Sequence, residues 1–536
     1  MYRSVIFHRA TSSRRDWLKF PNDEDVADQD EADDLSFGIF YRLLDDRNEV
    51  LRAFVHQITV EDFPHSSGEK LARHKLQGPQ NLLAELVKKL PNLEALYFEG
   101  SRSLPMSEEL VEVFLNHERS PKLFLHGERG HTPISITMPF VQEIRTSVDA
   151  RASEPRMRAL DDPDAEPFEP QRLDMHALFS AYPNIESLSV SINRLRGGCM
   201  MGSALSTRIS GPTLETTFPP LRSLSLSGYN IAQDEEDQPL WTEKFPWDKL
   251  RSLTLGHQLN PGFFKAATGK VHHLKRFKIT SYGNPSSCKD LDAFLLSFHT
   301  LESLTAKGTV PSLVAMAHHS DLEHLCLHSI EKPDEERISL SAKEMKALDR
   351  QHPHLKSLEL DIDPHDGEWP DDIVKALATS FKDIRQLSIH VGLRLSHLIT
   401  ICNADRKLND VLGIRNNQAF KSVLTDEKAQ AFAKRFFECR GPSNLKKITL
   451  QTGEDLRWFP QWAPRYADAE KHYAKIFEAY PPLHQGDEPR LEELMSDSAR
   501  FMKTMISMRS NRWVEKPSRL SRAPRVLQAS RFPSVV

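Results

Sequence analysis

The feature that most constrains this chain is a short apolar motif, leucine-x-x-leucine-x-leucine, that returns along most of its length. In residues 218–230, FPPLRSLSLSGYN, the motif is formed by Leu221, Leu224 and Leu226. Residues two apart on a strand point to the same face, so Leu224 and Leu226 share a face while Leu221 anchors the preceding turn. A single copy would fit any buried strand, and the number of copies therefore decides the fold.

Ten copies of this motif occur, some with conservative replacements. They start at Leu93, Ile185, Leu221, Leu250, Leu274, Leu301, Leu322, Leu355, Ile384 and Leu445, and a weaker copy starts at Val55. From Leu221 to Ile384 the intervals between successive starts are 29, 24, 27, 21, 33 and 29 residues. This spacing is close to the ~20–29 residues of leucine-rich repeats. Several unrelated α/β domains would not repeat one spacing so often.

The segments between copies have the apolar period of helices. Residues Gln80–Leu90 and Asp371–Phe381 each place their apolar side chains on one face. Prolines at 91, 183 and 353 mark the turn from helix to strand, because proline cannot continue a helix. One strand–helix unit cannot bury both of its apolar faces, but stacked units share a continuous core. We therefore predict an α/β fold: an irregular leucine-rich-repeat solenoid with parallel strands on its concave face and helices on its convex face.

Composition along the chain predicts four parts. An N-terminal segment, residues 1–50, contains the acidic run DEDVADQDEADD, which is expected to be disordered. The solenoid is expected over residues 51–455, with a proline-rich charged insert near 149–170 and a helical insert near 393–440. Residues 456–508, rich in tryptophan and proline, are expected to form a helical cap over the open end of the core, with Trp458, Phe459 and Trp462. Residues 509–536 are expected to form a basic, disordered tail.

Several classes of function are disfavoured by composition. The net charge of −5 over 536 residues is too small to indicate a nucleic-acid or membrane partner. No apolar run approaches the roughly 18 residues of a membrane span. The five cysteines include no C-x-x-C pair, which argues against a disulfide framework and a zinc finger. We expect a cytoplasmic or nuclear protein with no specific nucleic acid and no membrane among its partners.

The sequence contains no recognisable catalytic or cofactor-binding motif. No G-x-G-x-x-G, phosphate-binding loop, G-x-S-x-G or H-E-x-x-H occurs, so we expect neither an enzyme nor a bound cofactor. In the segment LEHLCLH, the side chains of His324, Cys326 and His328 would project together and are zinc-ligand types. Because no fourth ligand is assigned by the sequence, we predict no metal site.

The strongest candidate site is the row of outward strand positions on the concave face. We call the outward side chains of one strand a rung. Three basic rungs form a patch that precedes an acidic rung. We predict that the following residues of these rungs bind a partner: Arg276, Lys278, Lys307, His324, His328, Glu359 and Asp361. No acidic residue occupies an outward position on the three basic rungs. Like charges side by side on a sheet repel, and an acidic partner segment would relieve this repulsion. A face that is merely solvated remains the alternative.

Two stretches resemble a known family. MYRSVIFHR with FYRLLDDRNEVLRAFVHQITV resembles the segment after the F-box of fungal F-box/leucine-rich-repeat proteins, and SNLKKITLQTGEDLRWFPQWAPRYADAEKHYAKIFEAY resembles their closing segment. The resemblance implies a substrate receptor of a cullin ubiquitin ligase, in which the repeats hold the substrate and the F-box contacts a Skp-type adaptor.

The F-box itself would precede Tyr2, where this sequence has only Met1. It therefore either lies upstream in a longer chain or has been lost, and an adaptor is expected only in the first case. The alternative is a leucine-rich-repeat scaffold that works without an adaptor and has no link to ubiquitin ligases.

Overall fold

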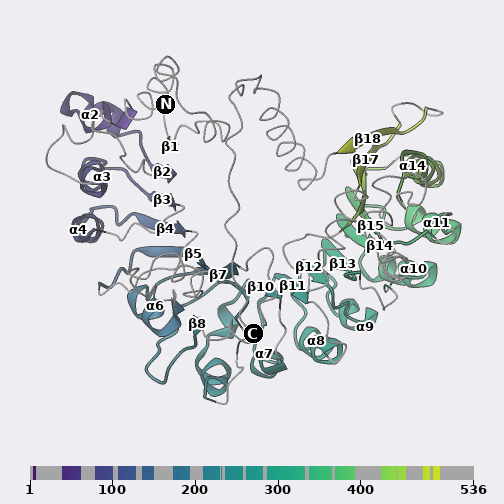
Figure 1. Cartoon of the computed structure of the whole chain (residues 1–536), viewed down its shortest axis with the longest axis horizontal. Coiled ribbons are helices and arrows are strands. Elements are labelled where there is room, and N and C mark those ends of the chain that lie inside the picture. Colours follow the sequence, from purple (N-terminus) through teal and green to yellow (C-terminus); the bar gives the residue numbers. More distant parts are fainter. Residues whose placement is uncertain are drawn as a thin grey trace, which may run out of the picture.

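The structure is a computed structural model, and its described part is an arc with strands on the inner side and helices on the outer side (Figure 1). The described residues are 4–7, 39–40, 42–61, 79–100, 107–127, 136–149, 173–193, 209–229, 231, 236–257, 261–281, 287–331, 337, 339–364, 368–392, 424–441, 443–453, 475–482, 484 and 487–494.

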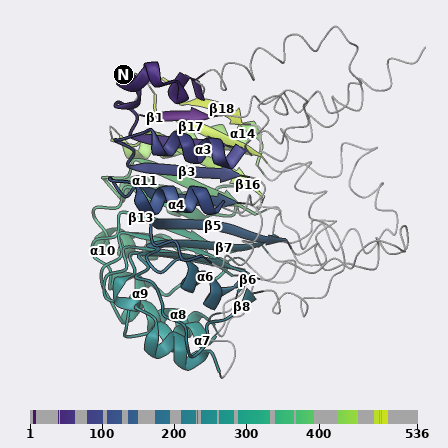
Figure 2. The same cartoon turned by 90° about the vertical axis from the view of Figure 1, so that its left-hand side faces the viewer.

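One sheet runs along the whole arc, with its strands in chain order (Figures 1 and 2). Its sixteen strands are β1 (Ser4–Phe7), β2 (Gln57–Glu61), β3 (Ala95–Gly100), β4 (Lys122–Gly127), β5 (Val141–Asp149), β7 (Ser187–Asn193), β9 (Ser223–Ser227), β10 (Ser252–His257), β11 (Arg276–Ser281), β12 (Ser303–Lys307), β13 (His324–His328), β14 (Ser357–Asp361), β15 (Gln386–Val391), β16 (Lys447–Thr452), β17 (Ile476–Tyr480) and β18 (Arg490–Leu494). Neighbouring strands are parallel from β1 to β16, whereas β17 and β18 pair antiparallel.

The helices cover the outer side of this sheet (Figure 1). They are η2 (Asp46–Asn48), α2 (Glu49–Arg52), α3 (Pro79–Lys88), α4 (Glu108–Asn116), α6 (Met175–Ala181), the π-helical turn η6 (Leu240–Lys244), η7 (Trp247–Lys249), α7 (Pro261–Ala267), α8 (Ser287–Leu296), α9 (Leu313–Ala317), α10 (Ala342–Gln351), α11 (Asp371–Thr379) and α14 (Asp426–Arg440). A two-stranded parallel ribbon of β6 (Leu173–Asp174) and β8 (Ile209–Ser210) lies apart from the main sheet. Within the described ranges, no helix is long and apolar enough to cross a membrane.

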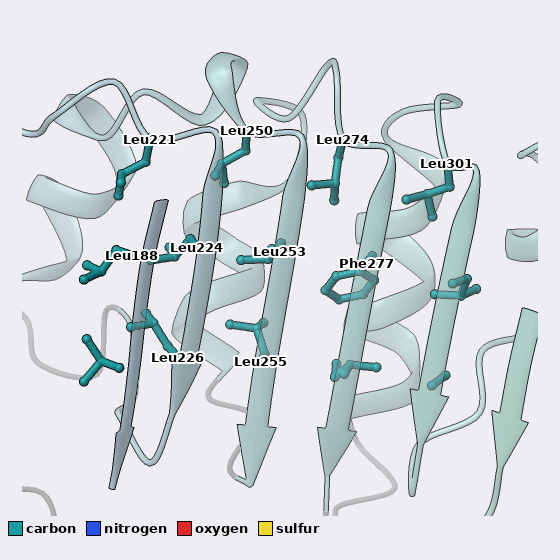
Figure 3. Close-up of a cluster of buried hydrophobic side chains, with 14 of the residues drawn as sticks. Leu188, Leu221, Leu224, Leu226, Leu250, Leu253, Leu255, Leu274, Phe277 and Leu301 are labelled. Atoms are coloured by element: carbon teal, nitrogen blue, oxygen red, sulfur yellow. The ribbon is translucent and has the colours of Figure 1, made fainter. Parts of the chain in front are cut away.

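The repeated motif forms the core of this arc. Each of the ten predicted copies coincides with a strand, and its apolar side chains stack with those of the next copy (Figure 3). Leu224, Leu253 and Phe277 are register partners on β9, β10 and β11, and each is at most 1% exposed. Stacking in register gives every strand an apolar neighbour on both sides, which a single repeat lacks. The chain is therefore an irregular leucine-rich-repeat solenoid of the α/β class, as the sequence predicts.

The turn before each strand aligns successive repeats through shared backbone hydrogen bonds. The N–H groups of Arg222 and Ser223 both donate to the carbonyl of Glu186, at 2.7 and 2.9 Å. One repeat later, Arg251 and Ser252 both donate to the carbonyl of Arg222, at 2.8 and 3.0 Å. The same arrangement recurs through β15. Because one acceptor receives two donors, each strand starts in a fixed register with the strand before it.

Two strands, β4 and β5, lie in a region where the sequence predicts no repeat. On β4, Leu123 and Leu125 occupy the second and third motif positions, but the first falls on Ser120, whose φ is +46°. On β5, Ile144 is followed two residues later by Thr146, which is 4% exposed. Threonine thus takes a leucine position, and the motif search misses both copies. The predicted insert near 149–170 lies almost entirely outside the described residues.

The predicted helical cap at 456–508 is wrong for the part that the structure describes, because β17 and β18 are strands. In β17, Phe477 and Ala479 alternate with more exposed side chains and are fully buried, which is the period of a strand. The helix α14 lies beside this pair, and Gln430 Nε2 donates to the carbonyl of Pro489 at 3.1 Å. The helix α14 itself falls within the helical insert predicted near 393–440. Trp458, Phe459 and Trp462 lie outside the described residues.

A second buried column precedes eight of the strands, three residues before the first motif leucine. Its members are Leu90, Tyr182, Trp247, Val271, Phe298, His319, His352 and Phe381, each at most 3% exposed. Two neighbouring histidines, His319 and His352, thus occupy positions that other repeats fill with apolar side chains. The ring of His319 lies 5.1 Å from that of Phe298. Burial lowers the pKa of His319 to about 4, and it also lowers the pKa of His352.

Acidification should therefore destabilise the fold through these histidines. The pKa of His319 falls on folding from its ordinary 6.5 to about 4, so between these values the unfolded chain binds a proton that the folded chain does not. The free energy of unfolding should drop as the pH falls through this window, by up to about 3 kcal/mol from His319. In urea titrations at several pH values, His319→Phe should flatten this slope, and exposed His272→Gln should leave it unchanged. Equal slopes for all three proteins would contradict the assignment.

Truncating one motif leucine should be costly. Leu325 on β13 is 2% exposed, and Leu325→Ala should lower the free energy of unfolding by about 2–5 kcal/mol through lost burial and a residual cavity. The matched control is Thr305→Ala on the concave face of β12, for which we expect a change within about 0.5 kcal/mol. Thermal and urea unfolding measure both, and an unchanged Leu325→Ala midpoint would refute the assignment of Leu325 to the core.

Candidate functional site

The strand register arranges the concave side chains in rows across the sheet, with one register shift between β4 and β5 at Leu123/Phe124. The first row, one residue from each strand, is Tyr97, Phe124, Glu143, Ser187, Ser223, Ser252, Arg276, Ser303 and His324. Neighbours in a row lie about 4.8 Å apart, so each row is one continuous strip of surface. Along the first row the side chains change from aromatic, through small hydroxyls, to basic.

Arg276 and Lys278 on β11 form an uncompensated positive charge on this face, and we refer to them as the basic pair. Both side chains are exposed, and the part of the chain that the structure describes provides no ion pair for either. Their register partners on β10 and β12 are Ser252, Thr254, Ser303 and Thr305. His324, also exposed, is two strands away on β13. This part of the predicted basic patch therefore has the accessibility that partner binding requires.

Two other members of the predicted patch, Lys307 and His328, are held by the acidic rung instead. Lys307 Nζ lies 3.1 Å from Glu359 Oε1, and His328 Nδ1 lies 2.7 Å from Asp361 Oδ1. His328 and Asp361 are 1% and 2% exposed. His328 and Asp361 are therefore buried and not open on the face, whereas the side chain of Lys307, beside Glu359, is 32% exposed. The partner-binding role of the seven predicted residues stays a prediction.

Charged and histidine side chains gather at the carboxyl ends of β12 to β15. We refer to this group as the acid–histidine cluster, and its members are Lys307, His328, Arg337, Glu359, Asp361, Asp363 and His390. The rings of His328 and His390 stack with centroids 4.1 Å apart, and His390 Nε2 lies 2.7 Å from Glu359 Oε1. Arg337 enters from the segment after β13 and contacts both Asp361 and Asp363. A Cβ on Gly392 would lie 2.9 Å from Arg337 Nη1, so a larger residue there would require the Arg337 side chain to shift.

The carboxylates of this cluster are held in the ionised form. Burial on its own would raise the pKa of Asp361, but the hydrogen bond with His328 and the charge of Arg337 outweigh burial and lower it. Burial likewise opposes ionisation of Glu359, but His390 and Lys307 lower its pKa. Burial lowers the pKa of His390, although its hydrogen bond with Glu359 acts in the opposite direction. The cluster is thus an internally compensated structural element of the concave face.

The alternating segment on β13 is not arranged as a metal site. Cys326 is buried, and burial raises the pKa of its thiol, which disfavours the thiolate that binds metals. His324 is exposed while His328 contacts Asp361. Among the described residues, no group of three or more histidine, cysteine, aspartate or glutamate side chains could hold a metal ion.

The structure also contributes concave-face residues that the sequence reasoning missed. Tyr97 on β3 and Phe124 on β4 are half-buried register partners whose rings stack, with centroids 4.3 Å apart and planes within 10°. We refer to them as the aromatic pair. Next to them, Glu143 contacts His126 at 3.1 Å and Arg145 at 2.6 Å. Phe124 was overlooked because β4 lacks the first leucine of the motif, although the alternation Leu123-Phe124-Leu125 already places Phe124 on the outward face.

The chain matches no protein family profile. It also matches no curated protein. Among solved structures, it aligns with a chain of the crystal structure of a TLR13–ssRNA13 complex at 14% sequence identity and a TM-score of 0.24. That alignment covers 65% of this chain and 57% of the other. The class of protein, a leucine-rich-repeat solenoid, is defined by the strand order and the repeated motif.

Breaking the acid–histidine cluster should destabilise the fold. His328 and Arg337 both contact the carboxylate of Asp361, and the side chain of Arg337 is only 5% exposed. Asp361→Ala would remove this shared carboxylate. Loss of one partner of a buried ion pair costs about 3–5 kcal/mol, and we expect a decrease in this range in the free energy of unfolding. Asp363→Ala is the control, because the Asp363 side chain is 41% exposed and Arg337 keeps Asp361. Equal losses in urea unfolding would show that Asp361 has no special role.

Proposed function

We propose that this chain is a non-catalytic protein-interaction module whose concave sheet face binds an acidic segment of another protein. The observation that carries this proposal is the exposed basic pair, Arg276 and Lys278, with uncharged register partners on both neighbouring strands. Every other strong concave charge discussed above has an opposite charge within contact distance, as Lys307 has Glu359. A cation pair left uncompensated on a continuous surface attracts an acidic partner and raises its association rate.

The absence of a recognisable catalytic constellation favours recognition over catalysis. In the described residues, the charged groups of the acid–histidine cluster satisfy one another. Stacked repeats also provide an extended concave surface of the kind that solenoids use for binding. We place this activity in the cytosol or the nucleus, as the sequence suggests.

We further propose that the bound protein is a substrate, by the resemblance of the N-terminal and closing segments to F-box receptors of cullin ubiquitin ligases. An adaptor-independent scaffold is the alternative. The two differ in one measurable property, because the receptor requires a Skp-type adaptor. Titration of purified adaptor against the full-length protein, expressed from its complete transcript, separates them: saturable binding supports the receptor, and none supports the scaffold.

Charge reversal tests the interaction proposal. Arg276→Glu with Lys278→Glu should leave the unfolding midpoint nearly unchanged, because substitutions at exposed sites usually change stability by less than about 0.5 kcal/mol. Binding of a fluorescein-labelled peptide rich in glutamate should be lost, and binding to the unmodified protein should weaken as salt is raised. Lys249→Glu with Lys265→Glu, on the convex side, is the control of equal charge change and should bind like the unmodified protein. Equal affinity for all three proteins would refute the role of the basic pair.

A further inference from the structure

The aromatic pair and Arg276 of the basic pair lie on one row of the concave face, and Lys278 lies on the adjacent row. Starting from Phe124, the register leads through Glu143, Ser187, Ser223 and Ser252 to Arg276, the final residue of this stretch. Five interstrand steps of about 4.8 Å separate Phe124 from Arg276, or about 24 Å. An extended peptide advances about 3.3 Å per residue, so six or seven residues would bridge the two ends.

The middle of this row is lined by small hydroxyl side chains. Ser187, Ser223 and Ser252 are half-buried serines on three successive strands, and the adjacent row has Ser189, Ser225 and Thr254 at the matching positions. Small side chains allow a peptide backbone to approach the sheet closely. Their hydroxyls can both donate and accept hydrogen bonds, as an extended backbone requires. The stretch from Ser187 to Ser252 therefore carries no bulky side chain on this row.

The two ends differ in the partner chemistry that they favour. Stacked aromatic rings at Tyr97 and Phe124 provide an apolar surface, and such pairs bind other large apolar side chains well. Glu143 lies beside them, and its hydrogen bond from His126 lowers the pKa of its carboxyl, so it is negatively charged. Arg145 pairs with this carboxylate at 2.6 Å, so the aromatic end has no uncompensated charge, whereas Arg276 attracts an acidic partner residue. This difference fixes which end of the row the acidic part of a bipartite segment occupies.

We propose that the concave face recognises an extended peptide segment of a partner protein that carries a large aromatic residue and an acidic cluster, with six or seven residues between them. The aromatic residue contacts Tyr97 and Phe124, the backbone crosses the serine rungs, and the acidic residues contact Arg276 and Lys278. This inference rests on the proposed function and adds the spacing and chemistry of the partner. It requires that the aromatic contact and the acidic contact form in the same complex. Attraction of an acidic segment by the basic pair does not by itself require an aromatic residue.

Synthetic peptides with a variable spacer test this inference. Fluorescein-labelled peptides carry a tryptophan and three glutamates, separated by two, seven or twelve glycine–serine residues, in both chain directions. The seven-residue spacer in one direction should bind at least tenfold more tightly than the two-residue spacer, which cannot span the row. Replacing its tryptophan by serine, or its glutamates by glutamines, should each weaken binding at least tenfold, as fluorescence anisotropy measures.

Protein variants locate each contact. Tyr97→Ser with Phe124→Ser should remove the benefit of the tryptophan while leaving the affinity of a glutamate-only peptide unchanged. Because these rings are half-buried, circular dichroism and urea unfolding must first show that this variant is folded. Ser223→Tyr, in the middle of the row, gives an independent test, because it should weaken the seven-residue peptide but not the glutamate-only peptide. Ser210→Tyr, exposed on β8 outside the main sheet, is its control.

The outcomes separate this inference from the proposed function. Affinity that depends on the glutamates but not on the tryptophan, the spacer or Ser223→Tyr would overturn the bipartite site and leave the acidic-partner proposal standing. Failure of every glutamate-containing peptide to bind would overturn both. Binding that tracks the tryptophan, the glutamates and the seven-residue spacing together would support the inference.

Discussion

Stacking of one repeat on the next in a fixed register is the constraint on which the rest of the structure depends. The shared carbonyls of the pre-strand turns, such as that of Glu186, set where each strand begins. The motif leucines then meet their counterparts, and neither apolar face of a repeat is left in water. A slip of one residue would send every leucine to the concave face, so the backbone bonds and the apolar columns specify the same alignment.

The same register determines what the concave face can present. Each outward side chain has fixed neighbours on two strands, and its effective charge depends on them. Lys307 and His328 contact the acids of β14, Glu359 and Asp361. Arg276 and Lys278 instead have serine and threonine as neighbours on β10 and β12, and they stay exposed. Which charged side chains remain available to a partner therefore depends on the neighbouring strands as well as on the strand that carries them. The aromatic pair illustrates the same rule, because Tyr97 and Phe124 stack only as register partners.

Sequence reasoning recovered the fold because its main signal is local. Three leucines within six residues identify a strand and its buried face, and the copies at Leu221 to Ile384 needed no long-range information. It missed β4 and β5 where Ser120 and Thr146 replace leucines, and it misread β17 where a five-residue alternation is too short to distinguish from a helix. It also placed His328 and Asp361 on the correct face but not in the interior. Their burial depends on each other and on Arg337, and the residues of this contact are up to 33 positions apart.

The antiparallel pair at the far end of the sheet affects how copies of this protein meet. A repeating sheet can in principle accept another copy at its last strand, because each strand offers the next one both hydrogen-bonding groups and an apolar column. Here the apolar column narrows to Leu491, a half-buried leucine beside Ala479, and β18 otherwise exposes Arg490, Glu492 and Glu493. A second molecule would gain little buried surface there and would have to desolvate charges. Within the described residues, this hairpin therefore disfavours end-to-end polymerisation into filaments.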